Sequence, residues 1–221
     1  MKKLLPSLDY TLAAPVNLDS GAQRLFPHAG ASFQNPLLEP SETQRLVDAI
    51  HLEHHIEWSY GGYHEDRSFL LRGTYLDEVG GYLHMGIDCN APAGTPITAP
   101  FRSTVVDVFD DGLELQGWGP RIIIATDSVR APYLLLGHLG PLQLSVGHQL
   151  EAGEIIGEIG APPGNGFWFP HLHLQIVSAA AFERLAAEDF RSLDGYGHPR
   201  DKVSLSADFP DPTWLVEDSL R

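Results

Sequence analysis

The stretch Phe169-Pro170-His171-Leu172-His173-Leu174-Gln175-Ile176-Val177 decides how this chain is organised. In an extended strand, side chains two positions apart leave the same face. His171 and His173 are therefore expected to point together, while Leu172 and Leu174 point the other way into a core. Two neighbouring imidazoles repel each other once both are protonated, and near neutral pH a metal ion is a common reason for such a pair. The stretch predicts a β-strand at the centre of a metal site.

The composition limits the class of protein. The chain has 221 residues, of which 43% are hydrophobic and 19% charged, values typical of a folded globular protein with a sizeable core. Its net charge of -15 argues against nucleic acid, anionic membranes and an anionic cell wall as partners. The single cysteine, Cys89, excludes an internal disulfide framework.

The N-terminus begins Met1-Lys2-Lys3-Leu4-Leu5, but its apolar run ends at Pro6 and is too short for a secretion signal. No stretch approaches the length of a membrane span. We therefore expect a cytoplasmic protein with no membrane partner. No feature of the sequence indicates the oligomeric state.

Short apolar segments separated by turn residues follow one another from Leu83 onward. Many short strands at such spacing predict an antiparallel, all-β core. The expected strands lie around Leu83–Cys89, Ile97–Ala99, Thr104–Phe109, Leu113–Gln116, Arg121–Thr126, Pro132–His138, Gln149–Leu150, Ile155–Gly160 and His171–Val177.

The segments outside these strands predict an extension at each end. Residues 1 to about 40 show no sustained period and are expected to form an irregular arm. Ser41-Glu42-Thr43-Gln44 has the pattern of a capping box, which predicts a helix of about three turns. Residues 178–190 predict one appended C-terminal helix, followed by a loop-like tail. We therefore divide the chain into an arm and helix that pack on the core (1–75) and a β domain with its helix and tail (76–221).

The strongest partner for the histidine pair is His84-Met85-Gly86-Ile87-Asp88. In a straight strand, four residues would separate His84 from Asp88 by roughly 13 Å, whereas zinc ligands lie about 2 Å from one ion. A shared metal therefore requires a bend near Gly86, which glycine permits. Two histidines and one carboxylate leave a tetrahedral zinc with an open position, as in catalytic sites, where a metal-bound water has a pKa of about 7.

A third segment makes the pattern specific. His84-x-x-x-Asp88, Gly137-His138-Leu139 and His171-x-His173 follow one another in that order on a β-rich core. This ordered set resembles the M23 family of zinc metallopeptidases, of the lysostaphin and LytM type. The turn at residues 91–96 and the Asn165-Gly166 loop also resemble that family. The resemblance covers roughly residues 80 to 178, and Asp211-Pro212 is similar to the closing Asp-Pro of the family.

The resemblance implies a fold, a cofactor and a set of roles. The implied fold is an antiparallel β-sandwich with the duplicated hybrid motif of lysostaphin, and the implied cofactor is Zn²⁺. The implied zinc ligands are His84, Asp88 and His173. His138 and His171 become a catalytic pair near the metal-bound water, as general base or as a clamp on the tetrahedral intermediate.

Other features depart from the secreted, wall-lytic members. The arm, the missing export signal and the acidity are unlike them, and residues 160–173 are more similar to M23-like modules fused to aminotransferases and small-molecule kinases. These departures point away from peptidoglycan as the substrate. Many members also carry a tyrosine upstream of the first ligand that supports the oxyanion, and Tyr63, Tyr75 and Tyr82 are the candidates here.

The predicted function is therefore a zinc-dependent hydrolase that cleaves a peptide or small amide substrate, most simply at a glycine-type bond. One alternative is a phosphocarrier resembling a sugar-phosphotransferase IIA domain, with His84 or His138 phosphorylated, which leaves His171 and His173 unexplained. Another is a metal-binding module without catalytic activity. The arm is also expected to be able to block the cleft as an inhibitory segment and to supply a fourth ligand such as Asn35 or a nearby histidine.

Overall fold

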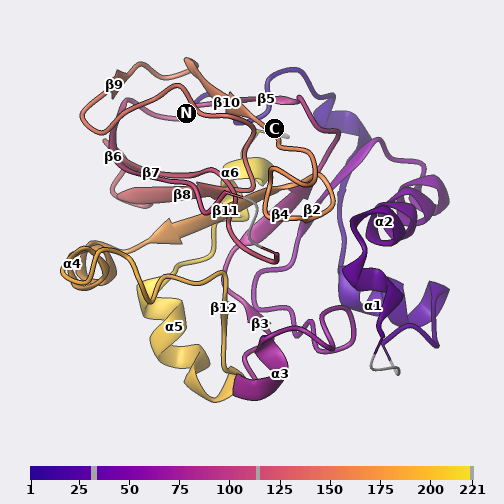
Figure 1. Cartoon of the computed structure of the whole chain (residues 1–221). Helices are drawn as coiled ribbons and strands as arrows, with labels where there is room; N and C mark the ends of the chain where they lie inside the picture. The colour runs from indigo at the N-terminus through magenta and orange to yellow at the C-terminus, as the bar shows by residue number, and fades with distance from the viewer. Residues whose placement is uncertain (31–33, 113–114, 220–221) are drawn as a thin grey trace.

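The computed structural model describes residues 1–30, 34–112 and 115–219, and a large β-sheet lies at the centre of these residues (Figure 1). Adjacent strands of this sheet run antiparallel, except for β1 and β2, which are parallel. In spatial order the strands are β1 (Ala13–Pro15), β2 (Trp58–Gly61), β4 (Ile87–Asn90), β11 (Leu172–Val177), β8 (Tyr133–Gly137), β7 (Arg121–Thr126), β6 (Ser103–Phe109) and β9 (Gln149–Leu150). The described chain is thus mostly β, as predicted.

Two small strand pairs stand beside this sheet. β5 (Pro96–Thr98) pairs with β10 (Ile155–Glu158), and β3 (Leu83–His84) pairs with β12 (Tyr196–Gly197). The first pair lies above the main sheet in Figure 1 and the second below it. The second pair matters for the site because it takes His84 out of the main sheet.

The middle residues of β7 and β8 form continuous apolar runs because both faces of the sheet are covered there. On β7, Ile122 and Ile124 pack into the main core with Trp58, whereas Ile123 joins a second cluster. That second cluster includes Leu185 of α4 (Ala179–Ala186). A continuous apolar run, rather than an alternating one, is the expected pattern for strands buried on both sides.

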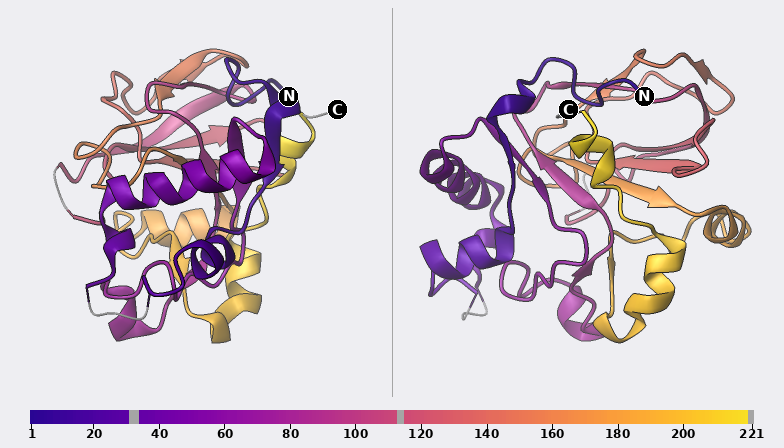
Figure 2. Two further views of the ribbon diagram at one scale, coloured as in Figure 1. Left: turned by 90° about the vertical axis from the view of Figure 1, so that its right-hand side faces the viewer. Right: turned by 180° about the vertical axis from the view of Figure 1, so that it is seen from behind.

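Helices gather at the two flanks of the sheet. α1 (Leu18–Leu25) and α2 (Pro40–His54) lie against each other on one side, and α4 and α5 (Lys202–Asp208) lie on another (Figures 1 and 2). The remaining short elements are α3 (Leu76–Val79), α6 (Trp214–Glu217) and the 3₁₀ turns Tyr10–Leu12, Pro36–Leu38 and Pro199–Asp201. Within the described residues, no helix is long and apolar enough to cross a membrane.

The N-terminal predictions were wrong in two respects. The expected irregular arm contains α1 and β1, and β1 adds a strand to the main sheet. The expected capping box does not form, because α2 begins at Pro40 and Glu39 is its N-cap without a side-chain hydrogen bond. Proline is favoured at the first helical position since it has no N–H to leave unpaired, and this preference overrides the Ser41-Glu42-Thr43-Gln44 pattern.

The C-terminal prediction of a single helix was also wrong. α4 ends at Ala186, and the left-handed backbone of Asp189 and Phe190 turns the chain back toward the sheet. The predicted loop-like tail contains α5 and α6. Of the strand predicted at 113–116, residues 113 and 114 lie outside the described residues, and Leu115 and Gln116 form a turn. The other predicted strands lie within two residues of their predicted positions, and the strand predicted at 83–89 is divided into β3 and β4.

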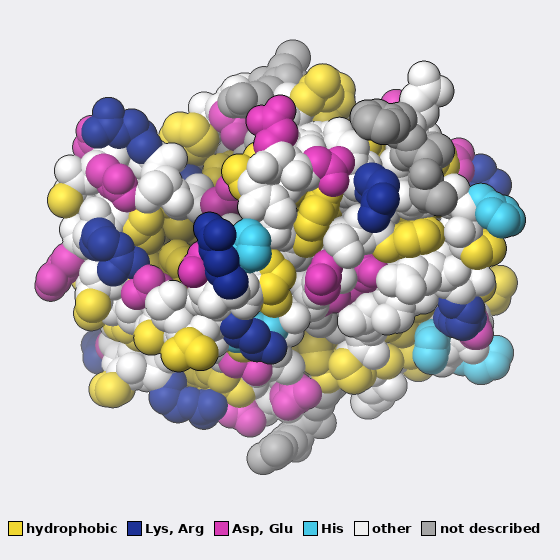
Figure 3. All heavy atoms as spheres, turned by 90° about the horizontal axis from the view of Figure 1, so that it is seen from below, with side chains coloured by type: hydrophobic (Ala, Val, Ile, Leu, Met, Phe, Trp, Pro, Cys, Tyr) yellow, Lys and Arg dark blue, Asp and Glu magenta, His cyan; other side chains and the backbone are white. Residues whose placement is uncertain are grey.

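Acidic and basic side chains are interspersed on the face seen from below (Figure 3). The net charge of -15 is therefore not gathered there into one patch of a single sign. Interspersed charges keep a surface solvated without creating a strong local field.

Candidate metal centre

The strand is interrupted at Met85 and Gly86, between β3 and β4, and this interruption brings His84 and Asp88 together. Before the break, His84 pairs with Tyr196 of β12. After it, Asp88 pairs with His173 of β11. A Cβ at Gly86 would lie 2.5 Å from the carbonyl oxygen of Leu174, so only glycine allows this close approach to β11. As a result, His84 Nε2 lies 3.4 Å from Asp88 Oδ1, far closer than a straight strand would allow.

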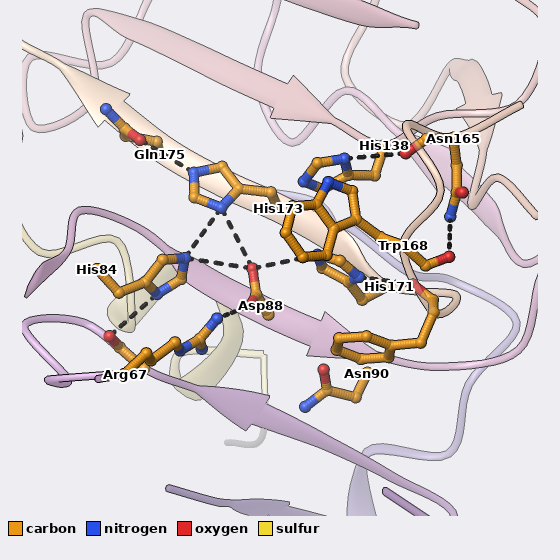
Figure 4. Close-up of polar contacts among 12 residues, drawn as sticks. Arg67, His84, Asp88, Asn90, His138, Asn165, Trp168, His171, His173 and Gln175 are labelled. Atoms are coloured by element: carbon orange, nitrogen blue, oxygen red, sulfur yellow. Dashed lines mark hydrogen bonds and ion pairs between the residues drawn. The ribbon is translucent and has the colours of Figure 1, made fainter. Parts of the chain in front are cut away.

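His173 completes a compact group of three (Figure 4). Its Nδ1 lies 3.2 Å from Asp88 Oδ1 and 3.1 Å from His84 Nε2. The ligand atoms that these residues offer all lie within 4.8 Å of one another, and all three side chains are buried. The structure therefore brings together the three residues that the resemblance implied as zinc ligands.

Hydrogen bonds outside the group fix which atoms point into it. His84 Nδ1 donates to the carbonyl oxygen of Gly62 at 3.0 Å, and His173 Nε2 donates to Gln175 Oε1 at 2.9 Å. In a neutral imidazole the other nitrogen then carries a lone pair, and these two lone pairs face Asp88. Such outer partners are typical of histidines that bind metals. Two imidazoles and a carboxylate, oriented in this way, fit Zn²⁺.

His138 and His171 form a second imidazole pair beside this group. Their ring centroids are 4.6 Å apart, and His171 Nε2 lies 3.7 Å from Asp88 Oδ1. The Nδ1 atom of His138 donates to the carbonyl oxygen of Asn165 at 3.1 Å, and that of His171 donates to the carbonyl oxygen of Phe169 at 2.8 Å. Each ring thus keeps Nε2 free of its proton. His138 reaches this place through a left-handed backbone (φ 61°) just after β8.

Burial keeps three histidines of the site neutral: His84, His138 and His171. It lowers the pKa of His84 to about 3, with the nearby Arg67 charge acting in the same direction. Burial also lowers the pKa of His138 and His171. Burial alone would raise the pKa of Asp88, but the Arg67 guanidinium holds it well below its usual value. A carboxylate and neutral imidazoles are the protonation states that a metal requires.

Arg67 is a site residue that the sequence did not reveal. Its buried guanidinium binds Asp88 Oδ2 at 2.5 Å and Glu65 Oε2 at 3.3 Å, which leaves Asp88 Oδ1 for the ligand group. It lies in the expected N-terminal segment of residues 1–75, 21 residues from Asp88, and no local motif marks it. Tyr196, 129 residues from Arg67, accepts a hydrogen bond from the same guanidinium at 3.2 Å and was missed for the same reason.

The residues suggested for supporting roles have other partners. The Tyr63 hydroxyl donates to the carbonyl oxygen of Phe209, that of Tyr75 bonds Asp194, and that of Tyr82 bonds Asp77. The amide of Asn35 donates to backbone carbonyl oxygens such as that of Leu70, 2.9 Å away. The expectation that Asn35 supplies a ligand was therefore wrong, because its side chain holds two loops together instead.

A cavity of about 480 Å³ opens onto these imidazoles. Its polar end consists of Arg67, Asp88, the second imidazole pair and His173, with Tyr196 beside them. Its outer part has aromatic walls, which include Trp118 and Trp168. A volume of this size is typical of a site for a small ligand or a substrate segment.

Comparisons with known proteins match the segment that carries the five residues. Residues 82–183 match peptidase family M23. The chain contains an M23 peptidase domain. All three ligand candidates and both catalytic candidates lie inside the matched M23 segment, whereas Arg67 and Tyr196 lie outside it.

Two staphylococcal relatives are similar to the M23 segment. The chain is 32% identical to lysostaphin of Staphylococcus staphylolyticus over 130 residues, which cover 57% of this chain and 25% of lysostaphin. It is 28% identical to glycyl-glycine endopeptidase ALE-1 of Staphylococcus capitis over 136 residues, which cover 61% of this chain and 35% of that protein. The chain thus spans about a quarter to a third of the length of these relatives.

A solved structure of the catalytic domain of lysostaphin from Staphylococcus simulans is also similar to this chain. The sequence identity is 29% and the TM-score is 0.36, and the match covers 42% of this chain and 66% of that one.

Proposed function

We propose that this protein is an M23-type, zinc-dependent hydrolase of peptide or other amide bonds. The observation that carries the proposal is the convergence of His84, Asp88 and His173 on one point, with two further imidazoles beside it. When bound, Zn²⁺ would supply a Lewis acid that activates water and polarises the scissile carbonyl group. The chain's own residues would do the rest of the chemistry.

In this proposal, His138 and His171 handle the protons. Both rings present an unprotonated Nε2 toward the cavity, because each Nδ1 donates to a carbonyl oxygen. One of the two accepts a proton from the attacking water at Nε2 and returns it to the leaving nitrogen. The lowered pKa values of both rings keep a lone pair ready at neutral pH.

We propose Tyr196 as the donor that supports the developing oxyanion. Its hydroxyl accepts from Arg67, and within the described residues no acceptor binds its own proton. Burial raises the pKa of Tyr196, so the phenol stays protonated. A preorganised donor of this kind is worth about 10²- to 10³-fold in kcat. Tyr196→Phe is expected to keep the metal and lower kcat by that factor, whereas Tyr82→Phe, whose hydroxyl bonds Asp77 outside the cavity, is expected to retain kcat.

A division of the chain into two parts belongs to the same proposal. We propose that residues 76–221 form the hydrolase unit, with the lysostaphin-type β-sandwich and its duplicated hybrid motif, and that residues 1–75 pack on it. The M23 match, which begins at residue 82, supports this boundary. The name of the family implies a peptide substrate, and a small amide is the alternative that we propose.

Metal analysis of purified variants tests the proposal directly. The unaltered protein is expected to hold one zinc per chain, and His84→Ala or Asp88→Ala to lose it. His138→Ala is expected to keep zinc but lose turnover on a panel of blocked peptides, with the exposed His148→Ala as the control. A protein that binds no zinc, or a fully active His138→Ala variant, would refute the proposal.

A further inference from the structure

Exposed apolar side chains meet at the mouth of the cavity. Ten large hydrophobic side chains of the described residues are exposed, and three of them line this one cavity: Tyr75 (46% exposed), Phe109 (41%) and Leu115 (70%). Trp118 and Trp168, both partly buried, line it as well. These five residues, called the apolar rim below, come from separate segments. Single exposed hydrophobics are normal, but a cluster around a cleft marks a binding surface.

The polar edges of the aromatic rings are bound by the protein itself. Trp118 Nε1 donates to the carbonyl oxygen of Leu193 at 3.3 Å, and Trp168 Nε1 donates to that of Gly117 at 2.9 Å. The Tyr75 hydroxyl bonds Asp194 at 3.0 Å. The rings are therefore held in place, and what remains for a ligand is apolar surface.

Most charged groups of the cavity are engaged in a similar way, whereas Arg191, which also lines it, donates from Nε to the carbonyl oxygen of Glu188 and makes no ion pair within the described residues. Arg67 is paired with Asp88 and Glu65, and Asp111 accepts from the backbone N–H groups of Trp118 and Gly119. Asp194 is bound to Tyr75 and to the backbone N–H group of Tyr196. Apart from Arg191, recognition beyond the scissile amide therefore falls to the apolar rim.

We infer that the substrate carries a bulky apolar group, aromatic or branched aliphatic, next to the scissile amide. This inference rests on the proposed function and names the substrate class of the same site. A glycine-type bond, the simplest expectation from the sequence, has no side chain to fill a cavity of about 480 Å³. Burying a phenylalanine-sized side chain favours binding by roughly 10- to 100-fold. The cavity thus selects against glycine.

Matched substrates test the inference. The probes are blocked triglycine and the same peptide with phenylalanine at its first, second or third position. At least one phenylalanine peptide is expected to be cleaved with a kcat/KM about 10-fold or more above that of triglycine. Phe109→Ala and Leu115→Ala are expected to lower this ratio. Val129→Ala and Val203→Ala, which alter exposed residues (98% and 87%) that do not line the cavity, are expected to preserve it.

A binding measurement separates this inference from the hydrolase proposal. Trp118 and Trp168 lie in the apolar rim, so their fluorescence is expected to report ligand binding. N-acetyl-phenylalanine amide is expected to bind about 10-fold or more tightly than N-acetylglycine amide, in both metal-free and zinc-loaded protein. Equal binding, or a preference for triglycine in cleavage, would overturn the inference. Selective binding without cleavage of any peptide would support it and count against the hydrolase.

Discussion

The imidazoles of the two candidate ligands present different nitrogens to the site, His84 through Nε2 and His173 through Nδ1. In each ring one acceptor binds the N–H and so leaves the other nitrogen unprotonated. The acceptor is the carbonyl oxygen of Gly62 for His84 and the amide oxygen of Gln175 for His173. The Gln175 amide nitrogen is buried and has no hydrogen-bond partner in the described structure. Its one side-chain hydrogen bond within the described residues is therefore the one with His173.

Replacing Gln175 is expected to weaken metal binding. Gln175→Leu leaves the His173 Nε2 proton buried without an acceptor, and losing such an outer partner costs about 10- to 100-fold in metal affinity. Gln175→Glu keeps an acceptor and is expected to bind zinc at least as well. Competition with a chelator measures both, with the exposed Gln149→Leu as the control. An unchanged affinity in Gln175→Leu would show that the ring orientation is set elsewhere.

Arg67 is expected to matter for folding before any metal binds. Arg67→Leu leaves the Asp88 and Glu65 carboxylates buried without their partner, which typically costs about 3–5 kcal/mol. Urea denaturation with a chelator present measures the free energy of unfolding, and added zinc should restore part of the loss by pairing with Asp88. Arg24→Leu breaks an exposed pair with Glu53 and should cost less than about 1 kcal/mol. Equal losses in the two variants would contradict this account.

The difference between predicted and unpredicted residues has a physical cause. His171 and His173 share a face because of the strand period, so three residues of sequence were enough to place them together. Arg67 and Tyr196 join the site only through pairings across 21 and 129 residues. Such contacts depend on strand order, which periodicity does not encode.

Among the secondary-structure elements, the broken strand at Gly86 has the largest effect on the site. β3 pairs with β12 and β4 pairs with β11, so the break sends His84 and Asp88 to different sheets that meet at one point. The sequence indicated that a bend was needed but not that the strand would change partners. The helix ends were harder to predict, because single residues set them and the spacing of apolar residues does not. Pro40 begins α2, and the left-handed residues after α4 turn the chain although apolar residues continue there.

A side chain at Gly86 is expected to open this junction. In Gly86→Ala the added Cβ would lie 2.5 Å from the Leu174 carbonyl oxygen and 2.8 Å from His173 Nε2. Overpacking of this kind costs about 1–3 kcal/mol and should also lower zinc affinity. Gly157→Ala is the control, because its nearest neighbour would be at an ordinary 3.6 Å. Thermal unfolding and chelator competition measure the two effects, and a Gly86→Ala protein with unchanged metal affinity would show that the junction tolerates movement.

At the scale of the whole molecule, the N-terminal segment is part of the core. Leu4, Leu5, Trp58 and Tyr60 belong to the same buried cluster as the central strands. Arg67 reaches the candidate metal group from this segment as well. The site thus depends on residues from both sides of the proposed boundary at 75 and 76, although the M23 match begins only at residue 82.

We therefore expect the chain to unfold as one cooperative unit. Because β2 lies between β1 and β4 in the main sheet, removing residues 1–75 would expose the apolar face that Trp58 and Tyr60 cover. A shortened chain of residues 76–221 is expected to lack a cooperative urea transition. In the full chain, far-ultraviolet circular dichroism and tryptophan fluorescence should give the same midpoint. Two separate midpoints, together with a folded 76–221 chain, would instead identify residues 1–75 as an independent cover on a self-sufficient M23 domain.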